Sequence, residues 1–219
     1  MIMLVLSCDN CKDTFEAFHK CLEKYYPDHP EVIYATETIK NPYYKTICKN
    51  YPFELWTKRI RETLKEIKDN KILLMTDDNF IRQPVDEERI KYVESVLKGN
   101  IAFFNFEKSF DINDQESCYK GFKKKNLKGI AVNSIMCGMW QKDKLMDVLN
   151  ITCKPWEIER LNIAFDYEYY INSEDFIINI GYKFQKPFGI TKSKWAREVV
   201  DFFEKEGIEM DYSKRGFYD

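Results

Sequence analysis

The chain has 219 residues, 32% of them charged, and 34 Lys and Arg against 36 Asp and Glu leave a formal net charge of −2 at pH 7. This balance excludes a sequence-independent nucleic-acid binder, which needs a strong basic excess, so we expect no nucleic-acid partner. Seven cysteines without a regular framework argue against a disulfide-stapled secreted domain and indicate free thiols in a reducing compartment.

In its first half the chain alternates apolar runs with amphipathic stretches. The runs are nearly continuous in apolar residues, which is typical of strands covered on both faces. The stretches between them repeat their apolar residues at helical spacing, and Asp86 is a suitable N-cap for the third. The predicted strands are 2–7, 31–37, 71–78 and 101–106, and the predicted helices begin near Phe15, Trp56 and Asp86.

This alternation predicts parallel strands linked by right-handed crossovers, and therefore a Rossmann-like α/β fold with three layers and a mainly parallel central sheet. The second half is less regular. Residues 107–128 are polar and predict a long excursion, 129–140 predict a strand that runs into a glycine turn, and a short helix follows. A last strand is predicted over 175–184 and an amphipathic helix over 191–207. We find no convincing linker and expect one domain over 1–219.

The apolar stretch at 2–7 is too short to cross a membrane, and it lacks both a preceding basic region and a small-residue cleavage site. We therefore interpret it as the first buried strand. No later stretch is apolar for long enough to span a bilayer. We expect a cytoplasmic protein, with any membrane contact peripheral and at the inner face.

Acidic residues follow the first three predicted strands. Ligands of open α/β sheets bind beyond the carboxyl ends of the strands, and the third strand ends in the adjacent pair Asp77 and Asp78. Two neighbouring carboxylates suit Mg²⁺ or Mn²⁺, which take carboxylate oxygens together with phosphate oxygens of a substrate. An ordinary turn explains a lone pair of aspartates equally well, because Asp is a common turn residue.

Cys8 and Cys11 form a C-x-x-C motif. No second C-x-x-C or C-x-x-H completes a zinc set, and a thioredoxin-like interpretation requires the pair to open a helix in a different pattern. We therefore expect two structural free thiols.

Five short motifs follow one another between residue 6 and residue 159. They are "LSCD" (6–9), "LWTKRI" (55–60), "LLMTDDNFIRQP" (73–84), "CGMW" (137–140) and "PWEIE" (155–159). In their order and spacing these motifs resemble those of GT-A glycosyltransferases, in particular small bacterial glycosyltransferases of capsule and lipopolysaccharide synthesis. The spelling D-D-N replaces the usual D-x-D, which leaves the metal-binding acid open between the two aspartates.

The resemblance implies a GT-A-like fold and a divalent metal, Mn²⁺ or Mg²⁺, with Asp78 as the direct ligand and Asp77 as a second ligand or a partner of the donor ribose. It places Ser7 and Asp9 in the nucleotide pocket, although a turn with a helix cap explains both equally well. It also pairs Arg59 with the diphosphate or an acid, and the alternative is a solvated helix face.

The resemblance further implies that Gly138 and Trp140 line the donor sugar and that Glu157 is the catalytic base, with Glu159 in reserve. A partly buried Glu beside an aromatic residue suits a base, because burial raises a carboxylate pKa. A helix beginning at Pro155 explains the same residues without catalysis, since acids are favoured in the first turn.

The function expected is transfer of a sugar from a nucleotide-sugar donor to a glycan or lipid-linked acceptor in surface polysaccharide synthesis, with a homodimer as a further expectation. One alternative is a sugar-phosphate nucleotidyltransferase, although "SCDNCKD" after the first strand lacks the glycine-rich basic signature of that class. The other is a non-catalytic nucleotide- or sugar-binding protein of the same fold.

Overall fold

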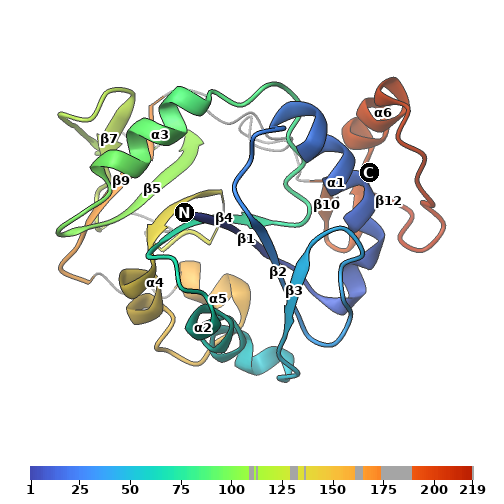
Figure 1. The fold of residues 1–219 in the computed structure, drawn as a ribbon, viewed down its shortest axis with the longest axis horizontal. Helices are drawn as coiled ribbons and strands as arrows, with labels where there is room; N and C mark the ends of the chain where they lie inside the picture. Colours follow the sequence, from blue (N-terminus) through green and yellow to red (C-terminus); the bar gives the residue numbers. More distant parts are fainter. Residues whose placement is uncertain are drawn as a thin grey trace.

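The computed structural model describes residues 1–108, 111, 113–128, 133–135, 137–160, 165–173 and 189–218. Its largest element is a nine-stranded sheet in the order β3-β2-β1-β4-β8-β5-β9-β7-β6 (Figure 1). The strands are β1 (Ile2–Leu6), β2 (Val32–Thr36), β3 (Lys45–Cys48), β4 (Lys71–Thr76), β5 (Ile101–Lys108), β6 (Gln115–Glu116), β7 (Phe122–Lys124), β8 (Gly138–Gln141) and β9 (Glu168–Asn172).

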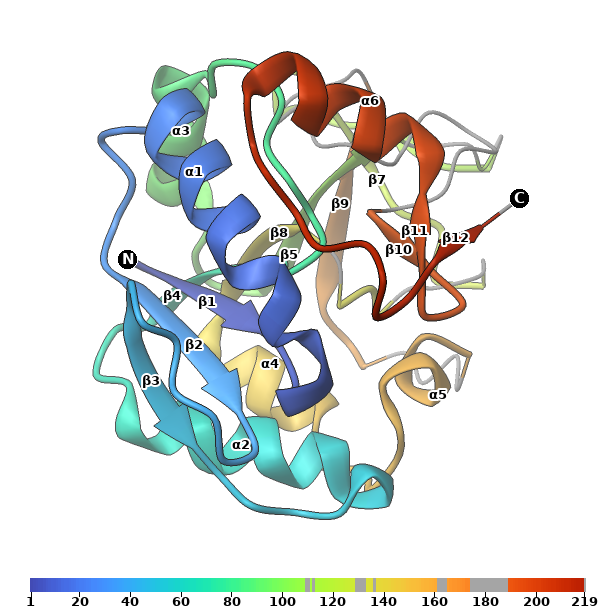
Figure 2. The same ribbon diagram turned by 90° about the vertical axis from the view of Figure 1, so that its right-hand side faces the viewer.

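Helices cover both faces of this sheet (Figure 2). The fully buried β1 shows why both faces need a cover. Met3 and Val5 point into one apolar cluster, whereas Ile2, Leu4 and Leu6 point into a second cluster on the other face. One cluster packs under α1 (Phe15–Tyr25), α3 (Glu87–Val96) and α6 (Arg197–Glu206). The other packs under α2 (Trp56–Glu66), α4 (Lys142–Val148) and α5 (Pro155–Arg160). The predicted three-layer α/β arrangement is confirmed.

The prediction of a mainly parallel sheet needs correction, because the sheet is mixed. β3, β2, β1 and β4 are parallel, but β8 lies antiparallel between β4 and β5. After β5 the chain forms the antiparallel pair β6–β7, which in turn joins the sheet antiparallel to β9. The segment between β5 and β8 contains no described crossover helix, and without such a crossover a returning strand runs in the opposite direction.

The amphipathic segment 191–207 also differs from its prediction. Only α6 is helical, and the residues before it form a hairpin of β10 (Ile190–Thr191) and β11 (Lys194–Ala196), which β12 (Phe217–Tyr218) joins to make a second small sheet. Lys192 and Ser193 have φ of 48° and 65°, as a tight hairpin turn requires. The strand predicted over 175–184 lies outside the described residues, as do 129–132 of the strand predicted over 129–140.

Within the described part of the chain, no helix is both long enough and apolar enough to cross a membrane.

Candidate functional site

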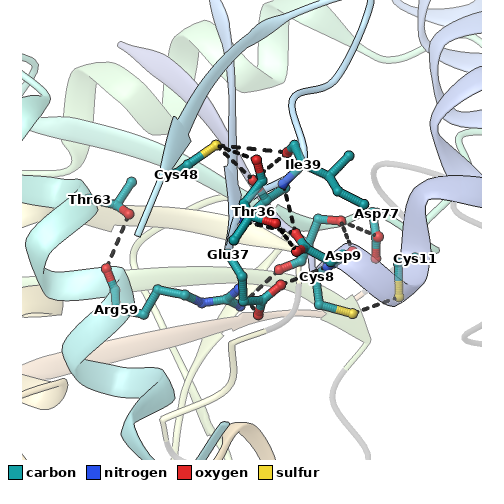
Figure 3. A network of polar contacts seen from close by, with 12 residues as sticks. Cys8, Asp9, Cys11, Thr36, Glu37, Ile39, Cys48, Arg59, Thr63 and Asp77 are labelled. Carbon is teal, nitrogen blue, oxygen red and sulfur yellow. Dashed lines mark hydrogen bonds and ion pairs between the residues drawn. The ribbon is translucent and has the colours of Figure 1, made fainter. Parts of the chain in front are cut away.

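Three adjacent parallel strands bring their carboxyl ends together. β2, β1 and β4 are neighbours in the sheet, and Leu6 is paired with both Ala35 and Thr76. The residues that follow these strands therefore meet at one edge. Figure 3 shows this cluster, to which η1 (Asp9–Thr14), the short 3₁₀ helix after β1, and α2 also contribute side chains.

Asp77 lies at the centre of the cluster and is only 5% exposed. Its Oδ2 accepts hydrogen bonds from Ser7 Oγ at 2.6 Å and from Thr14 Oγ1 at 3.2 Å. Burial raises the pKa of Asp77 well above its usual value, and the neighbouring Asp78 raises it further, although the two hydroxyl donors act in the opposite direction. Asp77 is thus a buried carboxyl group whose ionisation calls for a nearby cation.

Asp78 is half-buried and has different partners. Thr76 Oγ1 donates to its Oδ1 at 2.8 Å, and the Ile190 backbone N–H donates to the same carboxylate. Burial raises the pKa of Asp78, while these donors and the charge of Arg215 lower it in part. The approach of Ile190 depends on Gly189, because a Cβ at Gly189 would lie 2.3 Å from the Phe80 ring.

The second half of the cluster is an ion pair between Arg59 and Glu37. The Arg59 side chain is 2% exposed, and its guanidinium contacts Glu37 Oε1 and donates to the carbonyl oxygen of Ser7 at 2.8 Å. Glu37 Oε2 accepts from the backbone N–H of Asp9 at 2.7 Å. Arg59 is therefore not the solvated helix residue that the sequence left as an alternative. It joins α2 to the loops after β1 and β2.

Asp9 completes this arrangement by tying the β1 loop to the β2 loop. Its carboxylate accepts from Thr38 N and Ile39 N, each at 3.0 Å, and from Thr38 Oγ1 at 2.5 Å. Burial alone would raise the pKa of Asp9, but the hydrogen bonds from Thr38 and Ile39 outweigh it and hold the pKa below its usual value. An ionised acid at this position is consistent both with a loop cap and with a nucleotide contact.

The residues that could hold a divalent metal are Asp77 and Asp78. Within the described residues, no group of three or more His, Cys, Asp or Glu is arranged to hold a metal ion. A pair of carboxylates still fits Mg²⁺ or Mn²⁺, because these ions commonly take one or two protein acids and complete their shell with water and substrate phosphate. The raised pKa of both acids is the electrostatic signature of a site that a cation would relieve.

A second pair of acids, Glu107 and Glu159, lies near the same edge of the sheet, at the carboxyl end of β5. Leu74 of β4 and Asn105 of β5 both pair with Gly138, so two strand spacings, or about 10 Å, separate β4, which Asp77 follows, from β5, which contains Glu107. Burial raises the pKa of Glu107 to about 7, and the charge of Glu159 raises it as well. The hydrogen bond from Asn105 acts in the opposite direction.

Glu159, the other acid of this pair, comes from α5. Its Oε1 accepts from the backbone N–H of Ile135 at 3.2 Å, and burial raises its pKa despite that bond and one from Ser134. Two acids with raised pKa at one sheet edge are suited to proton transfer. The sequence interpretation missed Glu107, although the signal was present: the fourth predicted strand, like the first three, is followed by an acid.

Glu157 lies elsewhere on α5. It is exposed, and its Oε2 accepts from the backbone N–H of Lys154 at 2.8 Å. Trp156 beside it is 58% exposed and leans against Phe53, with ring centroids 6.0 Å apart. This is the helix-start arrangement that the sequence left as the alternative.

Gly138 and Trp140 lie within β8, away from any surface. A Cβ at Gly138 would lie 2.5 Å from the carbonyl oxygen of Phe104, so glycine is required by the approach of β5. Trp140 is fully buried and stacks on Phe103 at 4.2 Å. The structure gives both residues a packing role within the sheet.

Comparison with protein-family models finds no match, and comparison with curated proteins finds none either. Solved structures do match. A fragment of S. aureus TarS (1–349) in complex with UDP aligns with a TM-score of 0.51 and 12% identity over 79% of this chain and 58% of that chain. The chain has a GT-A fold.

Two further structures align with lower scores. Galactosyltransferase LgtC in complex with donor and acceptor sugar analogues gives a TM-score of 0.43 at 12% identity, over 67% of this chain and 60% of that chain. A 4-diphosphocytidyl-2C-methyl-D-erythritol synthase gives 0.44 at 10% identity, over 82% and 91%. This chain thus spans only about 60% of the LgtC and TarS chains, and at these identities the likeness concerns the fold alone.

Proposed function

We propose that this protein is a glycosyltransferase that moves a sugar from a nucleotide-sugar donor to a glycan or lipid-linked acceptor. The observation that carries the proposal is the Asp77–Asp78 pair, which follows the central strand β4 of a GT-A fold and is held beside Ser7 at the carboxyl edge. The structure of TarS with UDP supports a nucleotide-linked donor.

The proposed donor pocket lies at the loops after β1 and β2. Ser7, Asp9 and Arg59 belong to one hydrogen-bonded network with Asp77, and Glu37 joins them. A network of this kind fixes the loops before the ligand arrives, which lowers the entropy lost on binding. The carboxylates in it are acceptors suited to ribose hydroxyls and base N–H groups.

We propose Mn²⁺ or Mg²⁺ as the cofactor, with Asp78 as the direct ligand and Asp77 as the second acid. A bound divalent ion would neutralise the diphosphate of the donor as it becomes the leaving group. Asp78 suits direct contact better, because Asp77 is buried whereas Asp78 is partly exposed.

On the acceptor side, the protein needs a base that removes the proton of the attacking hydroxyl. Glu157 and Glu159 remain the candidates proposed from the sequence, and burial distinguishes them. The raised pKa of Glu159 and its proximity to Glu107 favour Glu159, since a base works best with a pKa close to the working pH. We propose an inverting transfer in which Glu159 accepts the proton of the attacking hydroxyl and the neighbouring Glu107 holds that proton together with Glu159.

The proposed setting is surface polysaccharide synthesis at the cytoplasmic face of a membrane, with a homodimer as the assembly. Support for the pathway comes from the motifs alone.

Titration of nucleoside diphosphates with and without Mn²⁺, followed by assays with nucleotide sugars, tests the function. We expect Mn²⁺-dependent binding and release of the nucleoside diphosphate on turnover. Pyrophosphate formation from a nucleoside triphosphate and a sugar phosphate would instead indicate a nucleotidyltransferase. Binding without turnover over a broad donor and acceptor panel would favour the non-catalytic alternative.

A further inference from the structure

Cys8 and Cys11 form a close pair of thiols at the start of a helix. Their Sγ atoms lie 3.2 Å apart, and the backbone N–H of Cys11 donates to the carbonyl oxygen of Cys8 at 2.9 Å. This backbone hydrogen bond between residues i and i+3 closes a β-turn, in which the first and last Cα atoms lie within about 7 Å of each other. Disulfides form over the same range, with an S–S bond of about 2 Å, so the backbone already suits a bridge.

A thioredoxin-like C-x-x-C pair opens a helix, and the structure places Cys8 and Cys11 at the start of one. Cys8 is the N-cap residue of η1, which runs directly into α1, and the unit β1–η1–α1–β2 is a strand–helix–strand crossover. The backbone N–H of Asn10 hydrogen-bonds the Cys8 sulfur, which favours the thiolate form of Cys8. The two cysteines are therefore arranged as a dithiol rather than as independent core residues.

The environment separates the two sulfurs chemically. Hydrogen bonding between them lowers the pKa of Cys8 to about 7 and raises that of Cys11, with Arg59 adding to the effect at Cys8 and Glu37 opposing it. Cys8 therefore forms the thiolate, the species that attacks disulfides, more readily than Cys11 does. Both residues are half-buried, whereas Cys21, Cys137 and Cys153 are buried.

We propose that Cys8 and Cys11 form a redox-active dithiol that exchanges with small-molecule disulfides such as glutathione disulfide. The Cys8 thiolate attacks one sulfur of glutathione disulfide and expels a glutathione thiolate, which takes up a proton. The Cys11 thiol then loses its proton, attacks Cys8 Sγ and expels the second glutathione. The net reaction converts one dithiol and one glutathione disulfide into one protein disulfide and two glutathiones.

This site lies in the segment proposed to hold the donor nucleotide. Cys8 stands between Ser7 and Asp9, and each of those residues is bonded to another loop of the pocket. A disulfide would constrain the segment that carries both residues. The assignment itself does not depend on the proposed transferase function, because it concerns only the state of the two thiols.

The test is to equilibrate the full chain in glutathione redox buffers at pH 7, quench with acid, alkylate the free thiols and map the peptides by mass spectrometry. We expect a Cys8–Cys11 disulfide in folded protein while the buried cysteines remain alkylatable only after unfolding. Cys11→Ser should stop at a mixed disulfide of glutathione on Cys8. Cys8→Ser should leave Cys11 reacting at least about tenfold more slowly than Cys8 does in the Cys11→Ser variant.

Cys118→Ser is the matched control, because Cys118 is the exposed cysteine and its loss should not change the bridge. If either cysteine variant fails to fold, the unmodified chain provides an independent measurement. The rate of iodoacetamide labelling at Cys8 is followed as a function of pH, and we expect its midpoint near pH 7. The proposal is overturned if Cys118 or Cys48 is oxidised while Cys8 and Cys11 stay reduced, or if the mixed disulfide accumulates on Cys11 rather than Cys8.

Discussion

At the scale of single residues, the two aspartates after β4 differ although they are neighbours. Their side chains have different partners: Asp77 bonds to Ser7 and Thr14, whereas Asp78 bonds to Thr76 and the Ile190 backbone. The two aspartates occupy the turn after β4, which the Asn79 backbone N–H closes by donating to the Thr76 carbonyl oxygen, and the carboxylates meet different neighbours from it. Asp77 therefore contributes to the stability of the β1 loop, and Asp78 is the more accessible acid for a cation.

Asp78→Ala should abolish Mn²⁺-dependent binding of a nucleoside diphosphate, because a single remaining acid gives a poor shell for a hard divalent ion. Isothermal titration with and without Mn²⁺ measures the effect. Asp143→Ala, which removes an exposed acid on α4, is the matched control and should bind as the unmodified protein does. Persistent Mn²⁺-dependent binding by the Asp78 variant, with its fold intact, would rule out Asp78 as the ligand.

Glu159→Gln should lower turnover by roughly a hundred- to ten-thousand-fold without weakening donor affinity, because a general base acts in the transition state. Glu157→Gln is the comparison, and we expect its turnover to stay within about tenfold of normal. Steady-state kinetics with a nucleotide sugar provide the measurement. The reverse pattern would return the role to Glu157, as the motif resemblance alone implies.

At the scale of elements, the C-terminal segment clamps η1. Arg215 donates to both carboxylate oxygens of Asp13, at 2.6 and 2.7 Å, and to the carbonyl oxygen of Asn10 at 2.6 Å. Lys214 also reaches the Asn10 carbonyl oxygen. The loop that carries the proposed donor residues is therefore held by residues about two hundred positions later in the chain.

Arg215→Gln should destabilise the protein by about 2–3 kcal/mol, because the bidentate pair with Asp13 is largely shielded from water and leaves a partly buried carboxylate behind. The midpoint of urea denaturation measures it. Lys214→Gln, at a side chain 42% exposed, should cost no more than about 1 kcal/mol. Equal effects of the two substitutions would show that Arg215 does not clamp η1.

The junction of β8 with β5 gives a second prediction at this scale. Gly138→Ala would place a Cβ 2.3 Å from the Phe103 ring and 2.5 Å from the Phe104 carbonyl oxygen, and the backbone oxygen has no room to move. We expect a loss of about 3 kcal/mol or more in the free energy of unfolding. Met139→Leu, a volume-conserving change at the next residue, should cost less than about 1.5 kcal/mol. A Gly138 variant as stable as the Met139 variant would contradict this packing.

At the scale of the whole molecule, the acidic edge makes stability depend on pH. The pKa of Glu107 is about 7 in the folded protein and about 4.5 in an unfolded chain. The folded state therefore binds this proton more tightly. The contribution of Glu107 to the free energy of unfolding is therefore greatest below pH 4.5. It falls by about 3 kcal/mol as the pH rises from 4.5 to 7, and it stays at the lower value above pH 7.

Glu107→Gln should flatten this part of the stability curve, because Gln does not titrate. Between pH 5 and pH 8 the unmodified protein should lose up to about 3 kcal/mol more than the variant does, as measured by urea denaturation. Glu159 and Lys125, the charged groups that act on Glu107, are present in both proteins. Parallel curves for the two proteins would mean that Glu107 ionises normally.

Local pattern alone determined the strands β1, β2, β4 and β5, three of the helices between them and the acid pair at the end of β4. These features depend on the spacing of apolar residues over ten or so positions, which the sequence displays directly. The fold class followed from their alternation. The motif resemblance added Ser7, Asp9 and Arg59, and the structure brings these residues together with Asp77.

The other features appear only when the chain is folded. The antiparallel insertion of β8, the meeting of Glu107 with Glu159 and the clamp of Arg215 on Asp13 all join residues far apart in the chain. Such pairings are set by the packing of whole elements and leave no periodic signal in the residues themselves. Cys8 and Cys11 show the same limit at short range: the sequence displays their spacing, but only the fold shows that they open a helix with their sulfurs in contact.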